Sequence, residues 1–215
     1  MMTPSPKKRV IMWDPYLEPE YRDVEFRLTY AGKLLSTRSN REDHVKRTPH
    51  KHDLRKEFHK QLKLLWQTHP TLVGLSSQKM DSGKSFLEDT ADYYATYGFR
   101  WVPLVTRSMS LFCKLEILML RPGDPGNVRS DLDNRLKTLF DALTMPPERM
   151  EGILPTSDEN PFFVLLQDDR LITHIVVESD TLLQSIDGDE NDVRLTITVT
   201  ARPYRVGIGN IDFAS

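Results

Sequence analysis

Four aspartates stand in two pairs beside apolar segments, and their spacing is the pattern with the clearest chemical meaning in this chain. Asp131 and Asp133 come at the expected start of a helix, and Asp168 and Asp169 come directly before an expected strand. Carboxylates that gather and leave open positions hold Mg²⁺, and a bound Mg²⁺ supplies an activated water for chemistry at phosphate near neutral pH. The sequence therefore indicates a metal-dependent reaction at a phosphate.

A purely structural interpretation of the same residues stays open. Asp131 can cap the helix, and the helix dipole favours Asp133 in the first turn. This interpretation does not account for Lys137 and Asp141, which follow Asp133 at four and eight residues along one flank, although a single pair at that spacing is common and weak. It also leaves the adjacent acids before the strand without a counter-charge, which we expect to be either a metal or a basic residue.

In the functional interpretation each polar group has a task. Asp169 arrives from a neighbouring strand and completes a ligand set with the two acids at the start of the helix. Lys137 neutralises the charge that develops at the scissile phosphate, or holds the phosphate in place. Asn134 orients a carboxylate or binds a phosphate oxygen, and Asp141 fixes Lys137.

Apolar periodicity predicts the elements that must position these residues. Alternation of apolar and polar residues predicts strands, and apolar residues three and four apart predict amphipathic helices. We expect a single α/β (α+β) domain, in which helices pack on a mixed β-sheet, because strands and helices mix without strict alternation. The expected strands cover 24–30, 99–106, 111–119, 171–178 and 193–201, the helices 52–67, 86–97 and 131–144, and the loops 32–49 and 70–84.

The segment 33–63 is strongly basic, although the formal net charge of the chain is −2. A local basic patch on a nearly neutral protein can bind a phosphate backbone, and the alternative is a solvated helix face. We expect the four histidines of this segment to be exposed or to contact phosphate. The candidate DNA-binding residues are Arg38, Arg41, Lys46, Arg47, Lys51 and Arg55.

These motifs resemble the RusA family of Holliday junction resolvases. The resemblance rests on Asp131-Leu132-Asp133-Asn134-Arg135-Leu136-Lys137, on Phe140-Asp141-Ala142-Leu143 and on Leu166-Gln167-Asp168-Asp169. It covers residues 129–178 closely, and the N-terminal half more loosely. Relative to that family, residues 66–110 and 145–165 look inserted, and the residues just before the motif are less basic.

The resemblance implies a homodimeric endonuclease that needs Mg²⁺, with Mn²⁺ as a substitute. Its substrate would be branched DNA in recombination and repair, in bacteria, phages or prophages. Two active sites related by a two-fold axis suit a two-fold substrate. The residues implied are the metal ligands Asp131, Asp133 and Asp169, the catalytic cation Lys137, and the supporting residues Asp141 and Asp168.

Composition sets the remaining limits. Cys113 is the only cysteine, so the chain has neither a disulfide framework nor a cysteine-based zinc site. No apolar run reaches membrane-spanning length, and we expect no signal peptide and no membrane partner. We expect a cytoplasmic protein with an N-terminal arm at 1–21, an endonuclease domain at 22–206 and a tail at 207–215.

Three rival functions remain beside the endonuclease. The first is a non-catalytic protein of the same fold that binds DNA junctions or other nucleic acid. The second is a metal-dependent phosphohydrolase that acts on a small molecule, which would leave the basic segment without a role. The third is a structural protein in which the acids only cap helices, and Mg²⁺ would then not change its thermal stability.

Overall fold

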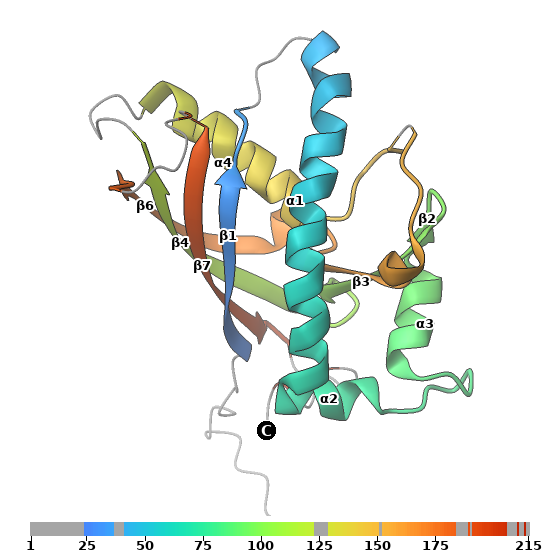
Figure 1. Cartoon of the computed structure of the whole chain (residues 1–215). Helices are drawn as coiled ribbons and strands as arrows, with labels where there is room; N and C mark the ends of the chain where they lie inside the picture. Colours follow the sequence, from blue (N-terminus) through green and yellow to red (C-terminus); the bar gives the residue numbers. More distant parts are fainter. Residues whose placement is uncertain are drawn as a thin grey trace, which may run out of the picture.

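Two mixed sheets and four α-helices make up the part of the chain that the structure describes (Figure 1). The elements form one α+β domain, which confirms the expected fold class. Of residues 41–47 and 129–131 only the backbone is described. This structure is a computed structural model, and it describes residues 24–36, 41–122, 129–150, 152–183, 189, 191–205, 210 and 213.

The larger sheet has the spatial order β1-β7-β4-β6. Its strands are β1 (Val24–Lys33), β7 (Asp192–Pro203), β4 (Leu111–Arg121) and β6 (Ile172–Thr181). β7 runs antiparallel to β1 and β4, whereas β4 and β6 are parallel. These strands confirm four of the five that the sequence predicts, and the fifth, expected at 99–106, is β3 (Phe99–Val105) of the smaller sheet. In β4 every second residue from Leu111 to Met119 is buried, and Cys113 is among them, as expected of a core residue.

The smaller sheet has the order β2-β3-β5 and unites the two segments that look inserted. It contains β2 (Ala95–Thr96), β3 (Phe99–Val105) and β5 (Phe162–Leu166). β3 is antiparallel to β2 and parallel to β5. A second apolar cluster lies here, formed by Phe99, Trp101, Met150, Phe162 and Val164. The sequence pattern does not predict β5, because five consecutive buried apolar residues show no alternation.

Helix α1 (Arg41–Thr68) begins well before the expected helix at 52–67, so the predicted loop at 32–49 is wrong from Arg41 onward. In the sequence, apolar residues at helical spacing begin only at Leu54, and the charged residues before it give no amphipathic signal. Pro49 lies inside the helix, where it removes one backbone donor without ending the helix.

Two short helices follow α1. Helix α2 (Pro70–Ser76) starts with a proline at its first position, which the missing N–H of proline favours. The predicted loop at 70–84 is therefore wrong over this turn. Helix α3 (Phe86–Tyr93) confirms the start of the helix expected at 86–97, and a capping box between Ser85 and Glu88 fixes that start. The end of the expected helix is wrong, because β2 occupies residues 95–96. None of the helices described has the length and apolar character to cross a membrane.

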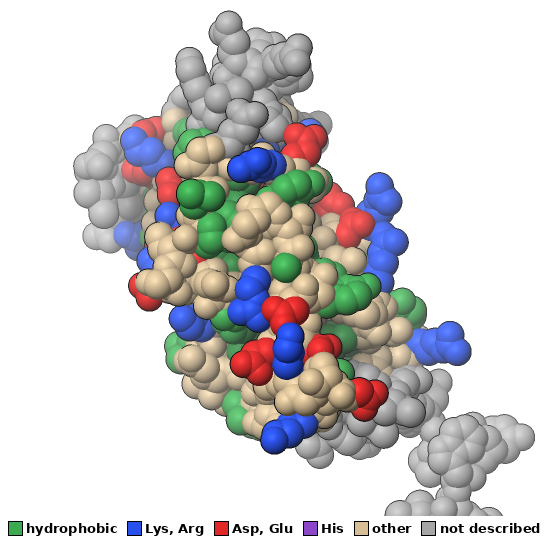
Figure 2. Space-filling model, turned by 90° about the vertical axis from the view of Figure 1, so that its right-hand side faces the viewer, with side chains coloured by type: hydrophobic (Ala, Val, Ile, Leu, Met, Phe, Trp, Pro, Cys, Tyr) green, Lys and Arg blue, Asp and Glu red, His purple; other side chains and the backbone are tan. Residues whose placement is uncertain are grey.

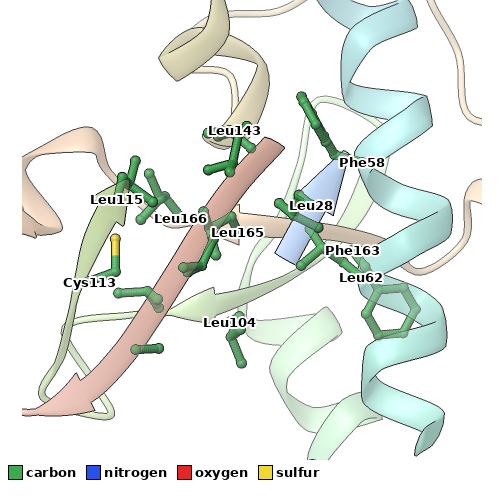
Figure 3. Close-up of a cluster of buried hydrophobic side chains, with 14 of the residues drawn as sticks. Leu28, Phe58, Leu62, Leu104, Cys113, Leu115, Leu143, Phe163, Leu165 and Leu166 are labelled. Carbon is green, nitrogen blue, oxygen red and sulfur yellow. The ribbon is translucent and has the colours of Figure 1, made fainter. Parts of the chain in front are cut away.

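The main core lies where both sheets meet α1 and helix α4 (Arg129–Leu143). Figure 3 shows side chains from β1, β3, β4 and β5 converging with residues of both helices. α4 confirms the helix expected at 131–144, and it runs from the end of the sheet where β4 finishes to the side of α1 (Figure 1). The described part of the chain also contains the 3₁₀ turns η2 (Ser157–Glu159) and η3 (Asp169–Leu171).

Candidate functional site

Helix α4 divides the Asp-Leu-Asp-Asn-x-x-Lys motif between the core and the solvent. Leu132 and Leu136 are partly buried against the main core, whereas Asp133 and Lys137 are exposed. The two exposed residues are one helical turn apart on the solvent side. The side chain of Asp131 lies outside the described residues. The motif therefore anchors the helix with its leucines and presents an acid and a lysine to solvent.

Arg135 fixes the motif end of α4 to the larger sheet. It is 4% exposed, and its guanidinium donates hydrogen bonds to the Leu34 carbonyl at 2.5 Å and to Asn191 Oδ1 at 3.4 Å. Leu34 follows β1 and Asn191 precedes β7, so both acceptors mark the same end of the sheet. On β7, Arg194 pairs with Leu120 at the end of β4. The motif end of α4 thus lies where β4 and β6 finish.

Asp141 pairs with a lysine from another helix and not with Lys137. Its carboxylate lies 2.5 Å from Lys51 Nζ, and the Lys51 side chain is 15% exposed. Asn134 is half-buried, and its backbone carbonyl accepts a hydrogen bond from the Thr138 hydroxyl. The expected role of Asp141 in fixing Lys137 is wrong, because Asp141 binds Lys51. The role of Lys51 in contacting DNA stays a prediction.

Arg55 is buried, so its expected role as a DNA contact is also wrong. Its guanidinium donates to the backbone carbonyls of Asp141, at 2.5 Å, and Thr144, at 3.2 Å, and it contacts the Met150 sulfur at 3.5 Å. These carbonyls lie at the C-terminal end of α4, where a cation stabilises the helix. Burial lowers the pKa of Arg55 to about 10, and the negative charge of Asp141 opposes this shift.

The other candidate DNA contacts stay predictions. Arg38 lies outside the described residues, and Arg41, Lys46 and Arg47 lie on α1 where only the backbone is described. Figure 1 shows that the first turns of α1 extend beyond the sheet. Figure 2, which views the molecule from the right-hand side of Figure 1, shows basic and acidic side chains interspersed on that face.

The Asp168–Asp169 pair has a protein counter-charge. Asp168 caps η3 by accepting a hydrogen bond from the Arg170 backbone N–H at 2.9 Å, and it pairs with Arg107 Nη2 at 3.0 Å. The Arg170 N–H, followed by the positive charges of Arg170 and Arg107, holds the pKa of Asp168 below its usual range. Asp169 is exposed. A basic residue thus meets the need for a counter-charge at this pair.

The two acidic groups lie at opposite ends of α4. Just after the helix, the Met145 N–H donates to the Leu166 carbonyl at 3.0 Å, and Leu166 is only three residues before Asp169. Asp133 is eleven residues before Thr144, which corresponds to about 16 Å along a helix axis. The two acidic groups also lie at different ends of β4. Ile172, which shortly follows Asp169, pairs with Cys113, whereas the motif end of α4 lies near Leu120. Leu120 is about 23 Å further along the strand than Cys113.

One chain therefore does not bring Asp133 and Asp169 to a common Mg²⁺. Among the described residues no three histidine, cysteine, aspartate or glutamate side chains gather closely enough to hold a metal ion. Because the described side chains do not include Asp131, the ligand assignment from the motif stays a prediction. The arrangement within one chain does not fit the expected three-carboxylate site.

Sequence patterns did not reveal a buried polar cluster between α1 and the smaller sheet. His52 and His59 are 3% and 5% exposed, so the expectation that they are exposed or contact phosphate is wrong. His59 Nδ1 accepts the Phe163 N–H at 2.8 Å, and the Glu159 carboxylate lies 3.4 Å from Lys56 and 4.0 Å from His52. Burial, and then the charge of Arg55, lowers the pKa of His52 to about 4.

A pocket of about 490 Å³ lies among α1, α2, α3 and the smaller sheet. Apolar side chains, including Trp66, Leu87 and Phe163, line it together with the charged Lys63 and Arg100. These residues come from segments far apart in the chain and share no motif, so no sequence signal points to the pocket. The pocket contains none of the motif acids.

Comparison with known proteins finds no matching family model, no matching curated protein and no matching solved structure.

Proposed function

We propose that this chain is a Mg²⁺-dependent, structure-selective endonuclease that hydrolyses phosphodiesters in branched DNA, as the RusA-type resolvases do. The observation that carries the proposal is the motif on α4, where Asp133 and Lys137 are exposed one turn apart while Leu132 and Leu136 anchor the helix. A helix that only needed acids for capping would not need Lys137 on the same exposed flank.

The exposed groups support contact with a large polyanion. Lys137 presents an ammonium to solvent at the side of α4 that carries Asp133, and such a cation binds a phosphate and neutralises charge on it. Mg²⁺, or Mn²⁺ in its place, would supply the activated water, with Asp131, Asp133 and Asp169 as the proposed ligands. Within one chain Asp133 and Asp169 lie apart, so the described residues of a single copy do not assemble this ligand set.

The remaining candidate DNA contacts lie at the start of α1. Arg41, Lys46 and Arg47 belong to the part of α1 that extends beyond the sheet (Figure 1). Contacts from these residues to phosphate would give salt-sensitive binding with little base recognition. A homodimer in the cytoplasm, acting in recombination or repair in a bacterium or from a phage or prophage, is the setting that this function implies.

A second candidate is a non-catalytic protein that binds nucleic acid. The observation that favours it is the position of Asp133 and Asp169 at opposite ends of α4. In that case Lys137 and the start of α1 would bind phosphate, and the acids would serve the helix and η3.

Cleavage of a labelled four-way DNA junction, with linear duplex as the comparison, tests the proposal. We expect paired nicks on the junction that need Mg²⁺ or Mn²⁺ and disappear in Asp133→Asn. Asp81→Asn is the matched control, because Asp81 is an exposed acid in the connection between α2 and α3. Tight junction binding without cleavage in either metal would overturn the endonuclease and favour the second candidate.

A further inference from the structure

The pocket among α1, α2 and α3 has the size of a site for a small molecule. Its volume is about 490 Å³, and ligand sites span about 300–1,000 Å³. In Figure 1 the three helices stand on three sides of a corner, and residues of β3 and β5 also line the pocket. None of the motif acids lines it, so the pocket is separate from the proposed metal site.

The walls of the pocket are largely apolar and partly aromatic. Trp66 of α1 and Phe163 of β5 have ring centroids 6.4 Å apart at an interplanar angle of 48°, and Val73 and Leu87 add aliphatic surface from α2 and α3. Trp66 also stacks on Phe86 at 6.1 Å, which holds its ring in place. Aromatic rings bind other rings in offset or edge-to-face arrangements. The walls therefore favour a flat, apolar ligand body.

Two of the charged side chains that line the pocket already have protein partners. Arg100 Nη2 lies 2.6 Å from Asp92 Oδ1. The Glu88 carboxylate accepts the Ser85 N–H at 3.1 Å and the Ser85 hydroxyl at 3.0 Å, as part of the capping box of α3. These pairs fix the start and the outer side of α3 and leave neither charge to attract a ligand strongly.

Lys63 is the charged lining residue that pairs with no acid in the part of the chain that the structure describes. Its Nζ lies 3.5 Å from the Asp158 carbonyl, which is longer than an ordinary hydrogen bond, and its side chain is half-buried. Lys60, one turn earlier on α1, instead pairs with Glu57 at 2.6 Å. An ammonium beside an apolar wall favours an anionic group, because a charged hydrogen bond is stronger where water is partly excluded.

We infer that this pocket binds a small molecule with a flat aromatic body and one anionic group, a carboxylate or a sulfonate. The rings of the ligand lie against Trp66 and Phe163, and the anionic group meets Lys63 Nζ. The inference goes beyond the proposed function, because the pocket contains none of the motif acids and its test uses no nuclease activity.

Two fluorescent probes that differ by one charge test the ligand class. We expect anilinonaphthalene sulfonate to bind the folded wild type at one site per chain in a fluorescence titration. Phenylnaphthylamine has the same rings without the sulfonate, and it should bind about tenfold more weakly because a hydrogen bond between charged groups is lost. The absence of saturable binding, or equal affinity for the two probes, would overturn the inference.

Variants of Lys63 locate the anionic group. Lys63→Gln should weaken binding of the sulfonate about tenfold and leave binding of phenylnaphthylamine unchanged, whereas Lys63→Arg keeps the charge and should retain most of the affinity. Lys60→Gln is the matched control, since Lys60 is exposed on the same helix and does not line the pocket. Equal effects of Lys63→Gln and Lys60→Gln would overturn the role of Lys63 and with it the inference.

A tryptophan that fills the pocket locates the aromatic body. Val73 is 38% exposed and lines the pocket, so Val73→Trp should fold and should abolish binding of both probes. Leu64→Trp is the control, because Leu64 is 58% exposed on α1 and does not line the pocket. Thermal unfolding confirms that each variant is folded. Probe binding by folded Val73→Trp at the wild-type affinity would place the probes elsewhere and overturn the inference.

Discussion

Lys51 Nζ lies 2.5 Å from a carboxylate oxygen of Asp141, and this ion pair joins α1 to α4. One turn further along α1, Arg55 donates to the backbone carbonyls of Asp141 and Thr144 at the end of α4. Two basic residues that the charge pattern offers as DNA contacts therefore hold the helix that carries the acidic motif. Part of the basic segment therefore serves the fold, and the basic residues earlier in the segment stay candidate contacts to phosphate.

The Lys51–Asp141 pair should show measurable coupling. We expect Lys51→Met and Asp141→Asn each to lower the free energy of unfolding by about 1–2 kcal/mol, and the double variant to cost little more than either single variant. Urea unfolding of the wild type and the three variants gives the coupling energy. The exposed Lys60–Glu57 pair is the control, for which we expect about 0.3 kcal/mol. Coupling no larger than the control would contradict a structural role.

Arg55→Met should destabilise the protein strongly. The substitution leaves the carbonyls of Asp141 and Thr144 without their donor in a buried position, so we expect a loss of about 3 kcal/mol in the free energy of unfolding. Arg27→Met provides the comparison, because Arg27 is exposed on β1, and it should change stability by less than about 0.5 kcal/mol. A folded Arg55→Met protein of normal stability that binds junctions weakly would instead restore Arg55 as a DNA contact.

His52 should make stability depend on pH. Its pKa in the folded protein is about 4, below the ordinary value of about 6.5 that the unfolded chain has. Protons therefore bind the unfolded state more readily, so the contribution is complete above about pH 6.5 and is lost as pH falls toward 4.

We expect the wild type to lose about 2 kcal/mol more than His52→Phe between pH 7 and 4.5. Phenylalanine suits this position, because His52 already contacts the rings of Phe99 and Phe162. Denaturant unfolding across this pH range measures the difference between the two proteins. Parallel pH curves would show that His52 does not titrate in the way that its burial implies.

Sequence patterns predict most of the larger sheet and the orientation of α4, because one face of each of these elements is buried. Leu132 and Leu136 face the core and Asp133 faces solvent, as a helix with an apolar stripe requires. The same logic fails for the start of α1 and for β5. The first has no apolar stripe, and the second is apolar on both faces.

The spatial relation between Asp133 and Asp169 is beyond what spacing can predict. It depends on the parallel pairing of β4 with β6 and on α4 running back along them, which together place the two acids at opposite ends of the helix. Motif residues that are 36 positions apart in the chain carry no information about that crossover. Only the strand pairing shows that a single copy keeps the acids separate.

Lys137→Gln separates binding from cleavage. If the exposed ammonium of Lys137 stabilises charge at the scissile phosphate, the variant should cleave a four-way junction about 100-fold more slowly, while junction affinity at fixed salt falls only a few-fold because one phosphate contact is lost. Lys60→Gln is the matched control, an exposed lysine on α1 that should leave the cleavage rate unchanged. Gel-shift titration and single-turnover cleavage on the same junction give the two quantities. Equal losses in affinity and in rate would show that Lys137 only binds DNA, and an unchanged rate would remove it from the active site.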